Sequence, residues 1–432
     1  MRLYIYALLM LFSLNAAAQP LLTVEDAVAE ALKNNYDIKL ADNNLKIDQQ
    51  NVSLANAGLL PNLYGSLSQN NSIQNSTQVR TDGTQQQLNN AKNNSLSYGV
   101  NLGWTIFDGF TMFAKYDQLK TLQRQGETEL KFAITTTVAD VMETYYTLVQ
   151  QQQMLKALDT AVVISKQRVT TAKNRFSIGK ASKLEVLNVE VDLNTDQTNY
   201  LKQLQEFKNT KTLLNQLLAR DLTADFKVSD EVPTDDKLDL PTLMDMASKQ
   251  NPQIQLALIN KRVAELNLKQ VKGARYPQVG VTTGYIFSES ESSLGFARSN
   301  KGNGFSYGLT ARINLFNGFL QNRNEKIARL QIQNTQVLIE QQTQEINTQL
   351  LTAFQTYLTN LDLVKLEASN VRIAEQNLDI TMEKYRIGTI TTLEVRTAQL
   401  NYVNALTRSS TAKLNAKLSE VGLNELAGNL KL

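Results

Sequence analysis

Two reactive side chains are missing from this 432-residue chain, which contains no cysteine and no histidine. Their absence excludes a disulfide framework, a lipid-modified N-terminal cysteine, Cys-His or Ser-His-Asp catalysis and histidine-ligated zinc. A formal charge of +3 provides no basic excess for nucleic acid. Carboxylate-only catalysis remains open, but no glycine-rich phosphate loop or tight acidic cluster accompanies it. We therefore expect no enzyme, no cofactor, no metal site and no nucleic-acid partner.

Long apolar runs are also scarce, and the most prominent one lies at the N-terminus. Arg2 precedes an apolar run at 3–14 and a small-residue string at 16–18. A transmembrane helix is the alternative interpretation, but the run is shorter than the roughly 20 residues that a span requires. We predict a secretory signal peptide at 1–18 and an exported chain. No later stretch of 18 apolar residues occurs, so a membrane role would need β-strands.

Proline is rare, and its placement leaves two very long stretches without it. The six prolines leave residues 62–232 and 278–432 free of the residue that most strongly breaks helices. Apolar residues in 110–173, and again in 186–218, recur at a spacing close to 3.5. Such spacing predicts long helices packed as coiled coils, each roughly 90 Å long for some 60 residues.

The chain contains two copies of one unit. RFSIGKASKLEVL at 175–187 returns as KYRIGTITTLEVR at 384–396, which places Gly388 opposite Gly179 (388 − 179 = 209). SYGVNLGWTIFDGF at 97–110 returns at 306–319 with the same shift, whereas KNNYDIKLA at 33–41 matches KQNPQIQLA at 249–257 with a shift of 216. The second copy has therefore lost seven residues between these points, as surface loops allow.

We predict four segments: a signal peptide (1–18), repeat 1 (19–219), an inter-repeat segment (220–241) and repeat 2 (242–432). Each repeat reads as a helix, a strand pair and a long helical hairpin. The strand pairs are expected at about 61–70 with 95–108 and at about 277–288 with 304–316, and the hairpin tips at 178–183 and 387–392. The Asn/Gln-rich stretch 69–95 is expected to be a long external loop, with a disordered linker as the alternative.

Each glycine marks the point where one helix ends and the next begins. Gly179 and Gly388 are expected just beyond the first helix of each hairpin, where positive φ suits glycine. Ser182, and Thr391 or Thr392, then cap the returning helices, with Glu185 and Glu394 near their N-terminal dipoles.

The predicted strands alternate between apolar and small polar residues. Even positions from Leu96 to Ile106 are apolar, and odd positions are Ser, Gly, Asn or Thr; residues 305–315 repeat this pattern. A soluble sheet with one buried face shows the same alternation, but the export signal and the aromatic residues near the strand ends favour an outer-membrane barrel. Four strands cannot close, so we expect an oligomer; dimer, trimer and tetramer give 8, 12 or 16 strands, and the sequence alone does not choose.

The duplicated strand pairs, the Phe-(Asp/Asn)-Gly-Phe strand exits at 107–110 and 316–319 and the paired tips resemble the TolC-like outer-membrane efflux proteins. The resemblance covers essentially the whole mature chain. It implies an α+β membrane protein: a homotrimer with a twelve-stranded outer-membrane β-barrel continued by a helical barrel across the periplasm. It also implies a periplasmic adaptor and an inner-membrane transporter as partners, outer-membrane lipid around the barrel, and an equatorial position for 220–241 and the tail 422–432. The exported substrate is not indicated.

The resemblance also assigns roles to individual residues. Adaptor docking carries over to the two tips, at Ile178, Gly179, Lys180, Ala181, Ser182, Ile387, Gly388, Thr389, Ile390 and Thr391. The periplasmic entrance carries over to Tyr385, Glu394, Glu185, Thr397 and Asn188. The family has an arginine where this chain has Ile390, and an aspartate where it has Thr397, so a salt-bridged gate and a cation-binding ring are not supported by those two positions.

Two alternatives remain open. A trimeric coiled-coil surface stalk or adhesin with a barrel anchor would have no transport role, although such stalks usually repeat one short module with a single C-terminal anchor. Glu394 could also serve only the N-terminus of its helix rather than an entrance.

Overall fold

The computed structural model describes residues 21–293 and 297–430, so the predicted signal peptide lies outside it. The described residues divide into two compact units, one drawn from 21–43, 128–256 and 340–430, the other from 44–127, 257–293 and 297–339. Each unit takes segments from both sequence repeats, so the compact units do not follow the repeat boundaries. Within the described ranges, no helix has the length and apolar character needed to cross a membrane.

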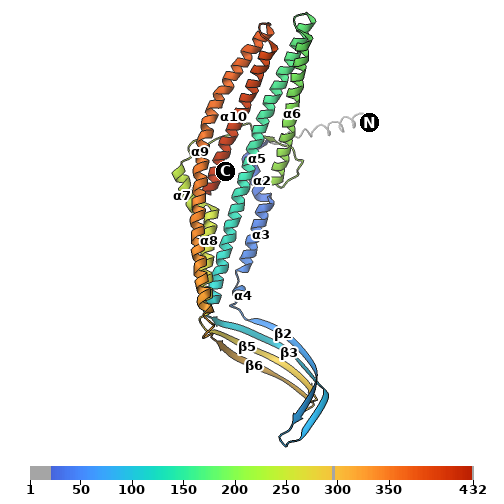
Figure 1. The fold of residues 1–432 in the computed structure, drawn as a ribbon, viewed down its shortest axis with the longest axis vertical. Coiled ribbons are helices and arrows are strands. Elements are labelled where there is room, and N and C mark those ends of the chain that lie inside the picture. Colours follow the sequence, from blue (N-terminus) through green and yellow to red (C-terminus); the bar gives the residue numbers. More distant parts are fainter. Residues whose placement is uncertain (1–20, 294–296, 431–432) are drawn as a thin grey trace, which may run out of the picture. The chain divides into compact units, whose positions relative to one another are not determined.

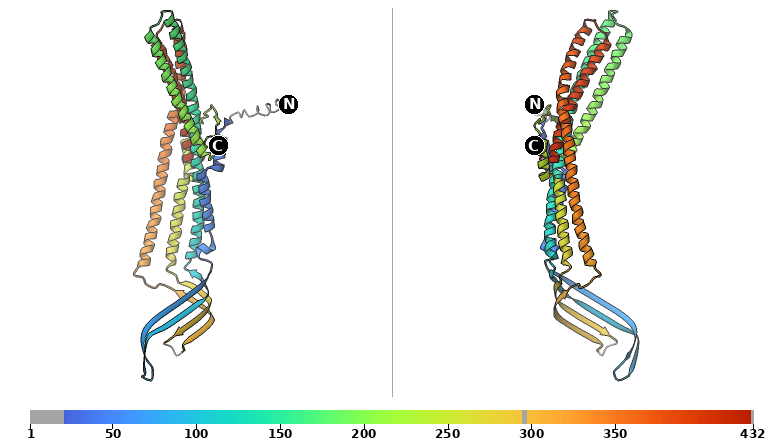
Figure 2. Two further views of the ribbon diagram at one scale, coloured as in Figure 1. Left: turned by 90° about the vertical axis from the view of Figure 1, so that its right-hand side faces the viewer. Right: turned by 60° about the vertical axis from the view of Figure 1, so that its left-hand side comes forward.

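The second unit contains an antiparallel sheet of four strands (Figures 1 and 2). The strands are β2 (Asn62–Val79), β3 (Gln85–Asp108), β5 (Gln278–Ser292) and β6 (Ser299–Arg312). They are ordered β2-β3-β5-β6, and every neighbouring pair is antiparallel. Consequently β2 and β6 form the two edges of the sheet, and neither edge is paired by another described strand of this chain.

The strand register confirms the predicted two-faced alternation. Tyr98 lies opposite Phe287, and their rings stack with centroids 5.1 Å apart. Because residues directly opposite each other share a face, the apolar positions of neighbouring strands form continuous rows. One such row contains Val100, Tyr285 and Phe305, while the adjacent row on the other face contains Asn101, Gly284 and Ser306.

The long polar loop predicted at 69–95 is wrong, because most of this stretch continues β2 and β3. The chain reverses only at residues 80–84, where Gly83 has a φ of 82°. Ladder pairs such as Ile73 with Lys92 and Ser76 with Leu88 extend the hairpin, with one register shift between Gln74 and Ser76. Backbone groups form this ladder, so a polar composition does not prevent it. The seven-residue length difference therefore lies in a strand hairpin that is longer in the first copy.

The last predicted strand ends earlier than expected, at Arg312 rather than 316. β6 pairs only with β5, and Arg312 lies opposite Gln278, the first residue of β5. Residues 313–316 consequently have no strand to pair with, whereas the corresponding end of β3 continues opposite β5 as far as Asp108.

Two or three consecutive helices precede each strand pair, where a single helix was predicted. They are α2 (Val24–Asn34), α3 (Tyr36–Asn51) and α4 (Leu54–Ala57) in the first copy, and α7 (Leu240–Gln250) and α8 (Pro252–Gly273) in the second. Asn35 donates through Nδ2 to the Leu217 carbonyl, and Asn251 donates to the Leu426 carbonyl, both at 2.9 Å. The same junction is thus built twice from residues far apart in the sequence.

Two long helical hairpins follow the strand pairs (Figure 1). The first consists of α5 (Thr111–Ser177) and α6 (Lys183–Leu217), the second of α9 (Leu320–Arg386) and α10 (Thr392–Ala427). A core in the first unit joins α5 to α2, α6, α10 and to β4 (Lys227–Val228), which pairs in parallel with β1 (Leu21–Leu22). Tyr145, 1% exposed within this core, donates to the Leu22 carbonyl at 2.9 Å.

Both hairpins reverse through the same hydrogen-bonded turn. Gly179 and Gly388 have φ values of 74° and 84°, in the left-handed region expected for them. The Gly388 N–H donates to the Tyr385 carbonyl and the Thr389 N–H to the Lys384 carbonyl, both at 3.0 Å, and residues 175–180 repeat this pair of bonds. This is a Schellman motif at each tip. A Cβ at either glycine would meet no heavy atom within 4 Å, so the requirement for glycine comes from φ alone.

We predict that Gly388→Val destabilises the second tip, because a β-branched residue is strained at positive φ. The left-handed conformation costs about 1–2 kcal/mol, so amide hydrogen exchange at 388–389 should accelerate about tenfold. Gly388→Asn is the control, since asparagine tolerates this conformation. Equal exchange rates in the two variants would contradict the assignment.

Candidate functional site

The two tips present short exposed segments between capped helices. Ser182 Oγ accepts a hydrogen bond from the Glu185 N–H at 3.1 Å, and Thr391 Oγ1 accepts one from the Glu394 N–H at 3.4 Å. At the second tip Glu394 also accepts from the Thr391 N–H at 3.1 Å, which completes a capping box. Thr391 rather than Thr392 is therefore the N-cap. Ile178 and Ile387 are 66% and 74% exposed, so an apolar side chain projects from each tip.

Tyr385 and Glu185, two of the predicted entrance residues, lie together between the hairpins. The Tyr385 hydroxyl donates to Glu185 Oε1 at 3.5 Å, although the side chain is only 2% exposed. The Arg175 guanidinium lies 5.4 Å from the centre of the Tyr385 ring and 3.9 Å from the Glu185 carboxylate. Burial raises the pKa of the Tyr385 hydroxyl, so it remains a hydrogen-bond donor at neutral pH.

The other predicted entrance residues do not join this contact. Glu394 is exposed and bonded to the N-cap of its own helix. Thr397 is exposed and donates to the Leu393 carbonyl one turn earlier. Asn188 is exposed on α6. The local geometry of Glu394 matches a helix-capping role.

Sequence reasoning missed a buried charged cluster between the hairpins, made of Arg168, Asp192, Asp196, Arg396 and Gln399. Arg396 reaches both Asp196 oxygens from Nη1, at 2.7 and 3.0 Å. Arg168 bonds Asp192 at 2.9 Å and Gln399 at 3.2 Å. Gln399 Nε2 also donates to Asp196 Oδ2 at 3.1 Å. The cluster joins α5 and α6 of the first hairpin to α10 of the second.

Burial makes this cluster unusual. Arg168 is 1% exposed, and Asp196 and Gln399 are also buried. Two arginines balance two aspartates, as buried charges require. One signal was available in the sequence: Asp196 lies on the apolar lattice of α6 that runs through Val186, Val189 and Leu193. A carboxylate at such a core position indicates a buried partner, but the lattice does not identify it.

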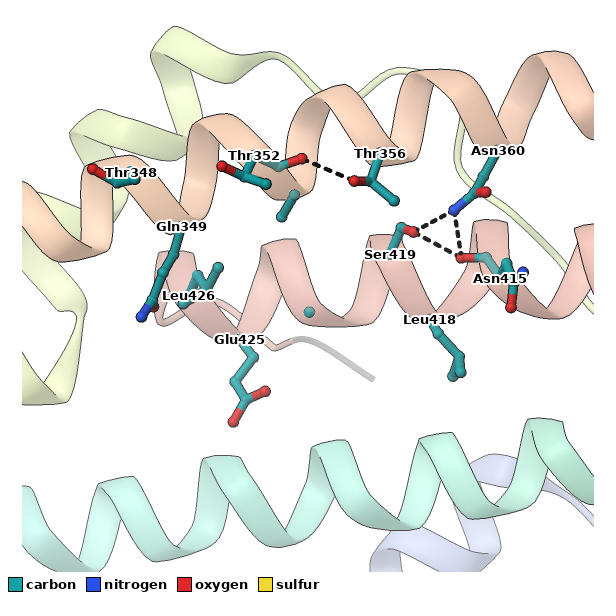
Figure 3. A pocket seen from close by; sticks show the side chains of 12 residues that line it. Thr348, Gln349, Thr352, Thr356, Asn360, Asn415, Leu418, Ser419, Glu425 and Leu426 are labelled. Carbon is teal, nitrogen blue, oxygen red and sulfur yellow. Dashed lines mark hydrogen bonds between the residues drawn. The ribbon is translucent and has the colours of Figure 1, made fainter.

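A groove with a volume of about 810 Å³ runs between α9 and α10 of the second hairpin (Figure 3). Small side chains dominate its walls, and a Cβ added to Gly422 would meet no heavy atom within 4 Å. Asn360 Nδ2 links the two helices by donating to Ser419 Oγ at 2.8 Å and to the Asn415 carbonyl at 3.3 Å. The groove is lined by Thr348, Gln349, Thr352, Ala353, Thr356, Asn360, Asn415, Leu418, Ser419, Gly422, Glu425 and Leu426.

Glu425 lines this groove and also lies near two acidic side chains of α5, Asp140 and Glu143. Burial is the main cause that raises its pKa, and the charge of Asp140 adds to the effect. The pKa of Asp140 is raised for the same reasons, by burial and by the charge of Glu143. Thr136 donates to Glu425 Oε1 at 3.4 Å, which offsets part of the penalty. The ionised forms are therefore disfavoured in the folded protein.

A two-faced antiparallel sheet combined with paired helical hairpins is the architecture of TolC-like outer-membrane channels. The chain belongs to the outer membrane efflux protein family, whose model matches residues 27–220 and 243–429. Its predicted location in the outer membrane, with helices extending into the periplasm, is thereby confirmed.

Individual relatives are distant but span most of the chain. The outer membrane efflux protein BepC of Brucella suis biovar 1 (strain 1330) is 19% identical over 386 residues, covering 88% of this chain and 80% of BepC. The outer membrane protein TolC of Escherichia coli (strain K12) is 20% identical over 370 residues, covering 79% of this chain and 71% of TolC. These relatives support an export-channel role.

Solved structures share the fold. The CmeC outer membrane channel of Campylobacter jejuni superposes with a TM-score of 0.78 at 19% identity, covering 94% of this chain and 85% of CmeC. The open state of the MtrE outer membrane channel of Neisseria gonorrhoeae gives a TM-score of 0.73 at 15% identity, covering 94% and 89%.

We predict that Glu425→Gln stabilises the protein at neutral pH. The folded-state pKa of Glu425 lies above its ordinary value, so stability is lost as pH rises from that ordinary value through the raised one. Glutamine mimics the protonated acid; the melting temperature should rise at pH 7 and be unchanged near about pH 3, where both forms are neutral. Glu383→Gln, at a side chain 71% exposed, is the control. A lower melting temperature at pH 7 would contradict the burial of a disfavoured charge.

Proposed function

We propose that the chain forms a homotrimeric duct that carries substrates out of the cell through the outer membrane. It receives them from an inner-membrane transporter through a periplasmic adaptor. The observation that carries the proposal is the pair of sheet edges, β2 and β6, that no described strand pairs, in a chain of the outer membrane efflux protein family.

The sheet edges support closure by other copies. In hydrocarbon, each unpaired backbone group costs several kcal/mol, so an open four-stranded sheet is not a stable membrane structure. Because each neighbouring pair is antiparallel, β2 and β6 run in opposite directions. β6 of one copy can therefore extend the same antiparallel pattern onto β2 of the next. Three copies give twelve strands, with the apolar rows facing lipid and the small polar rows facing the lumen.

The repeat supports assembly of the helices as well. Leu351, Leu358 and Leu366 of α9, which we call the α9 seam, are 44%, 47% and 56% exposed, although their spacing of seven and eight residues places them on one face of the helix. The residues 209 positions earlier on α5 are Met142, Val149 and Ala157, and all three are buried at 7%, 0% and 6%. Met142 and Val149 belong to the core that also contains Val421 of α10. The equivalent face of α9 needs an equivalent partner, which we assign to α6 of a second copy.

The inter-repeat segment 220–241 is proposed as part of a collar around the helices, together with the tail 422–432. Contacts within the first unit support this role. Lys156 of α5 forms an ion pair with Asp230 at 2.7 Å, and Gln153 donates to the Asp230 carbonyl at 2.8 Å. Glu420 of α10 accepts a hydrogen bond from the Asp235 N–H at 2.9 Å. The segment thus binds helices from both hairpins.

The tips are proposed as the docking surface for the adaptor, and Tyr385 with Glu185 as the contact that narrows the entrance. The exposed isoleucines and the duplicated turn support docking at residues 178–182 and 387–391. The buried Tyr385 hydroxyl can hold the second hairpin against the first, whereas Glu394, Thr397 and Asn188 are exposed. Opening then requires the loss of the Tyr385 hydrogen bond.

We predict that Leu358→Glu prevents assembly. A charge at the centre of the α9 seam would be buried without a partner in the trimer but exposed in the monomer, so it penalises the trimer alone. Native mass spectrometry of detergent-purified protein should report a shift from trimer to monomer. Thr359→Glu, one exposed residue further along the helix, should remain trimeric. Trimers of normal abundance with Leu358→Glu would contradict the seam.

We also predict a small resting conductance for the wild type in planar bilayers and a larger one for Tyr385→Phe. The substitution removes only the hydroxyl, which bonds Glu185 of the first hairpin and Thr392 of its own hairpin, and leaves the buried ring in place. A gain of about tenfold corresponds to the loss of one hydrogen bond of about 1.4 kcal/mol. Arg408→Gln, which breaks an ion pair within the second hairpin, is the control. A surface stalk would conduct in neither form, and that outcome would exclude the duct.

A further inference from the structure

The charged cluster is the firmest polar connection between the two hairpins near the tips. Asp196 receives Arg396 at 2.7 Å, Ser165 at 2.6 Å and Gln399 at 3.1 Å, so its carboxylate is saturated by three partners from α5 and α10. Arg168 adds bonds to Thr392 Oγ1 at 3.0 Å and to the Thr392 carbonyl at 3.2 Å. Separating α10 from the first hairpin would leave buried charges without partners, which is strongly unfavourable.

The contact at the tip is much weaker by comparison. The Tyr385 hydroxyl lies at the limit of a hydrogen bond, 3.5 Å from Glu185, and the Arg175 ion pair measures 3.9 Å. On the first hairpin, Arg168 precedes Arg175 by seven residues, or about 10 Å along a helix. The same two hairpins are thus joined by a largely buried cluster and, toward the tip, by a looser contact; Thr392, which accepts from Arg168 and bonds the Tyr385 hydroxyl, lies between the two.

The sequence repeat shows that the cluster is special to the contact within one chain. Arg396 and Arg168 correspond to Leu187 and Asn377, and Asp192 and Asp196 to Asn401 and Ala405, at the shift of 209. All four corresponding residues are uncharged. If copies contact one another through equivalent faces, as proposed above, the joint between copies lacks the four charges that lock the joint within a chain.

We propose that Arg168, Asp192, Asp196, Arg396 and Gln399 form a permanent clamp between the two hairpins of each chain, which stays closed when the duct opens. Opening then consists of release of the Tyr385 contact and movement at the joints between copies, while each chain pivots about its own clamp. The inference rests on the proposed duct function, and the clamp residues act as positioning residues.

Reversible cross-linking tests which joint must open, because the chain has no cysteine of its own. Met154 of α5 and Thr407 of α10 are in contact at 3.1 Å and line a hollow of about 340 Å³ beside the cluster, where a reagent can enter. The clamp pair is Met154→Cys with Thr407→Cys in a Tyr385→Phe background. The tip pair is Glu185→Cys with Tyr385→Cys. Both are treated with a bis-methanethiosulfonate linker, which a reductant removes.

The expected results differ between the pairs. Conductance of the tip pair should start high, fall at least tenfold on cross-linking and recover with reductant. Conductance of the clamp pair should start high and stay within twofold of its initial value after cross-linking. Closure of the clamp pair to the same extent as the tip pair would overturn the proposal. A failure of the duct function is distinguishable, since no variant would then conduct before the linker is added.

The role of the charges is tested separately in the clamp pair. Arg396→Gln should slow cross-linking between positions 154 and 407 at least threefold, because the joint is no longer held closed. The charge exchange Arg396→Asp with Asp196→Arg should restore most of the rate, and Arg408→Gln should leave it unchanged. If Arg396→Gln fails to assemble, the exchange variant alone decides: restored assembly and rate support the clamp. Equal rates in Arg396→Gln and the parent would overturn it.

Discussion

Every open antiparallel sheet has two edges, and this chain provides no described strand for either edge of its sheet. The same need for a partner applies to the sheet and to the long helices. Unpaired backbone groups at a strand edge are unfavourable in lipid, and the exposed leucines of α9 are unfavourable in water. In the proposed assembly, another copy covers both. In the proposed assembly, the internal repeat gives one chain two quasi-equivalent surfaces, one packed within the chain and the other packed against a neighbouring copy. In the proposed trimer, the same contacts between copies would therefore close the sheet and cover these leucines.

Features that depend on local chemistry could be predicted from the sequence. Positive φ at Gly179 and Gly388 follows from the need to reverse a helix, and the N-caps follow from Ser182 and Thr391 three residues before a glutamate. The two faces of the sheet follow from a period of two, and the register brings Tyr98 and Phe287 together as that period requires. The extent of the strands did not follow, because the ladder from Ile73 to Val79 uses backbone groups under polar side chains.

Features that depend on contacts distant in sequence could not be predicted. Arg168 meets Gln399 across 231 residues, and Asp196 meets Arg396 across 200. No local period indicates which of the chain's 44 basic residues will neutralise a carboxylate on an apolar lattice. Of the five entrance residues assigned from the family resemblance, only two lie in contact with each other in the structure. Tyr385 and Glu185 meet, whereas Glu394, Thr397 and Asn188 do not join them, and the roles of all five remain predictions.

The two copies tolerate changes in length very differently. Their strand hairpins differ by seven residues, yet α5 and α9 are both 67 residues long. A single residue inserted into α9 would rotate everything beyond it by about 100° and advance it by about 1.5 Å. Tyr385 would then turn away from Glu185, and the exposed leucines of α9 would lose their proposed register with α6 of a second copy. The equal lengths of α5 and α9 therefore matter for the contacts along them. An insertion into α9 keeps its side chains on nearly the same faces only when it adds a whole number of heptads.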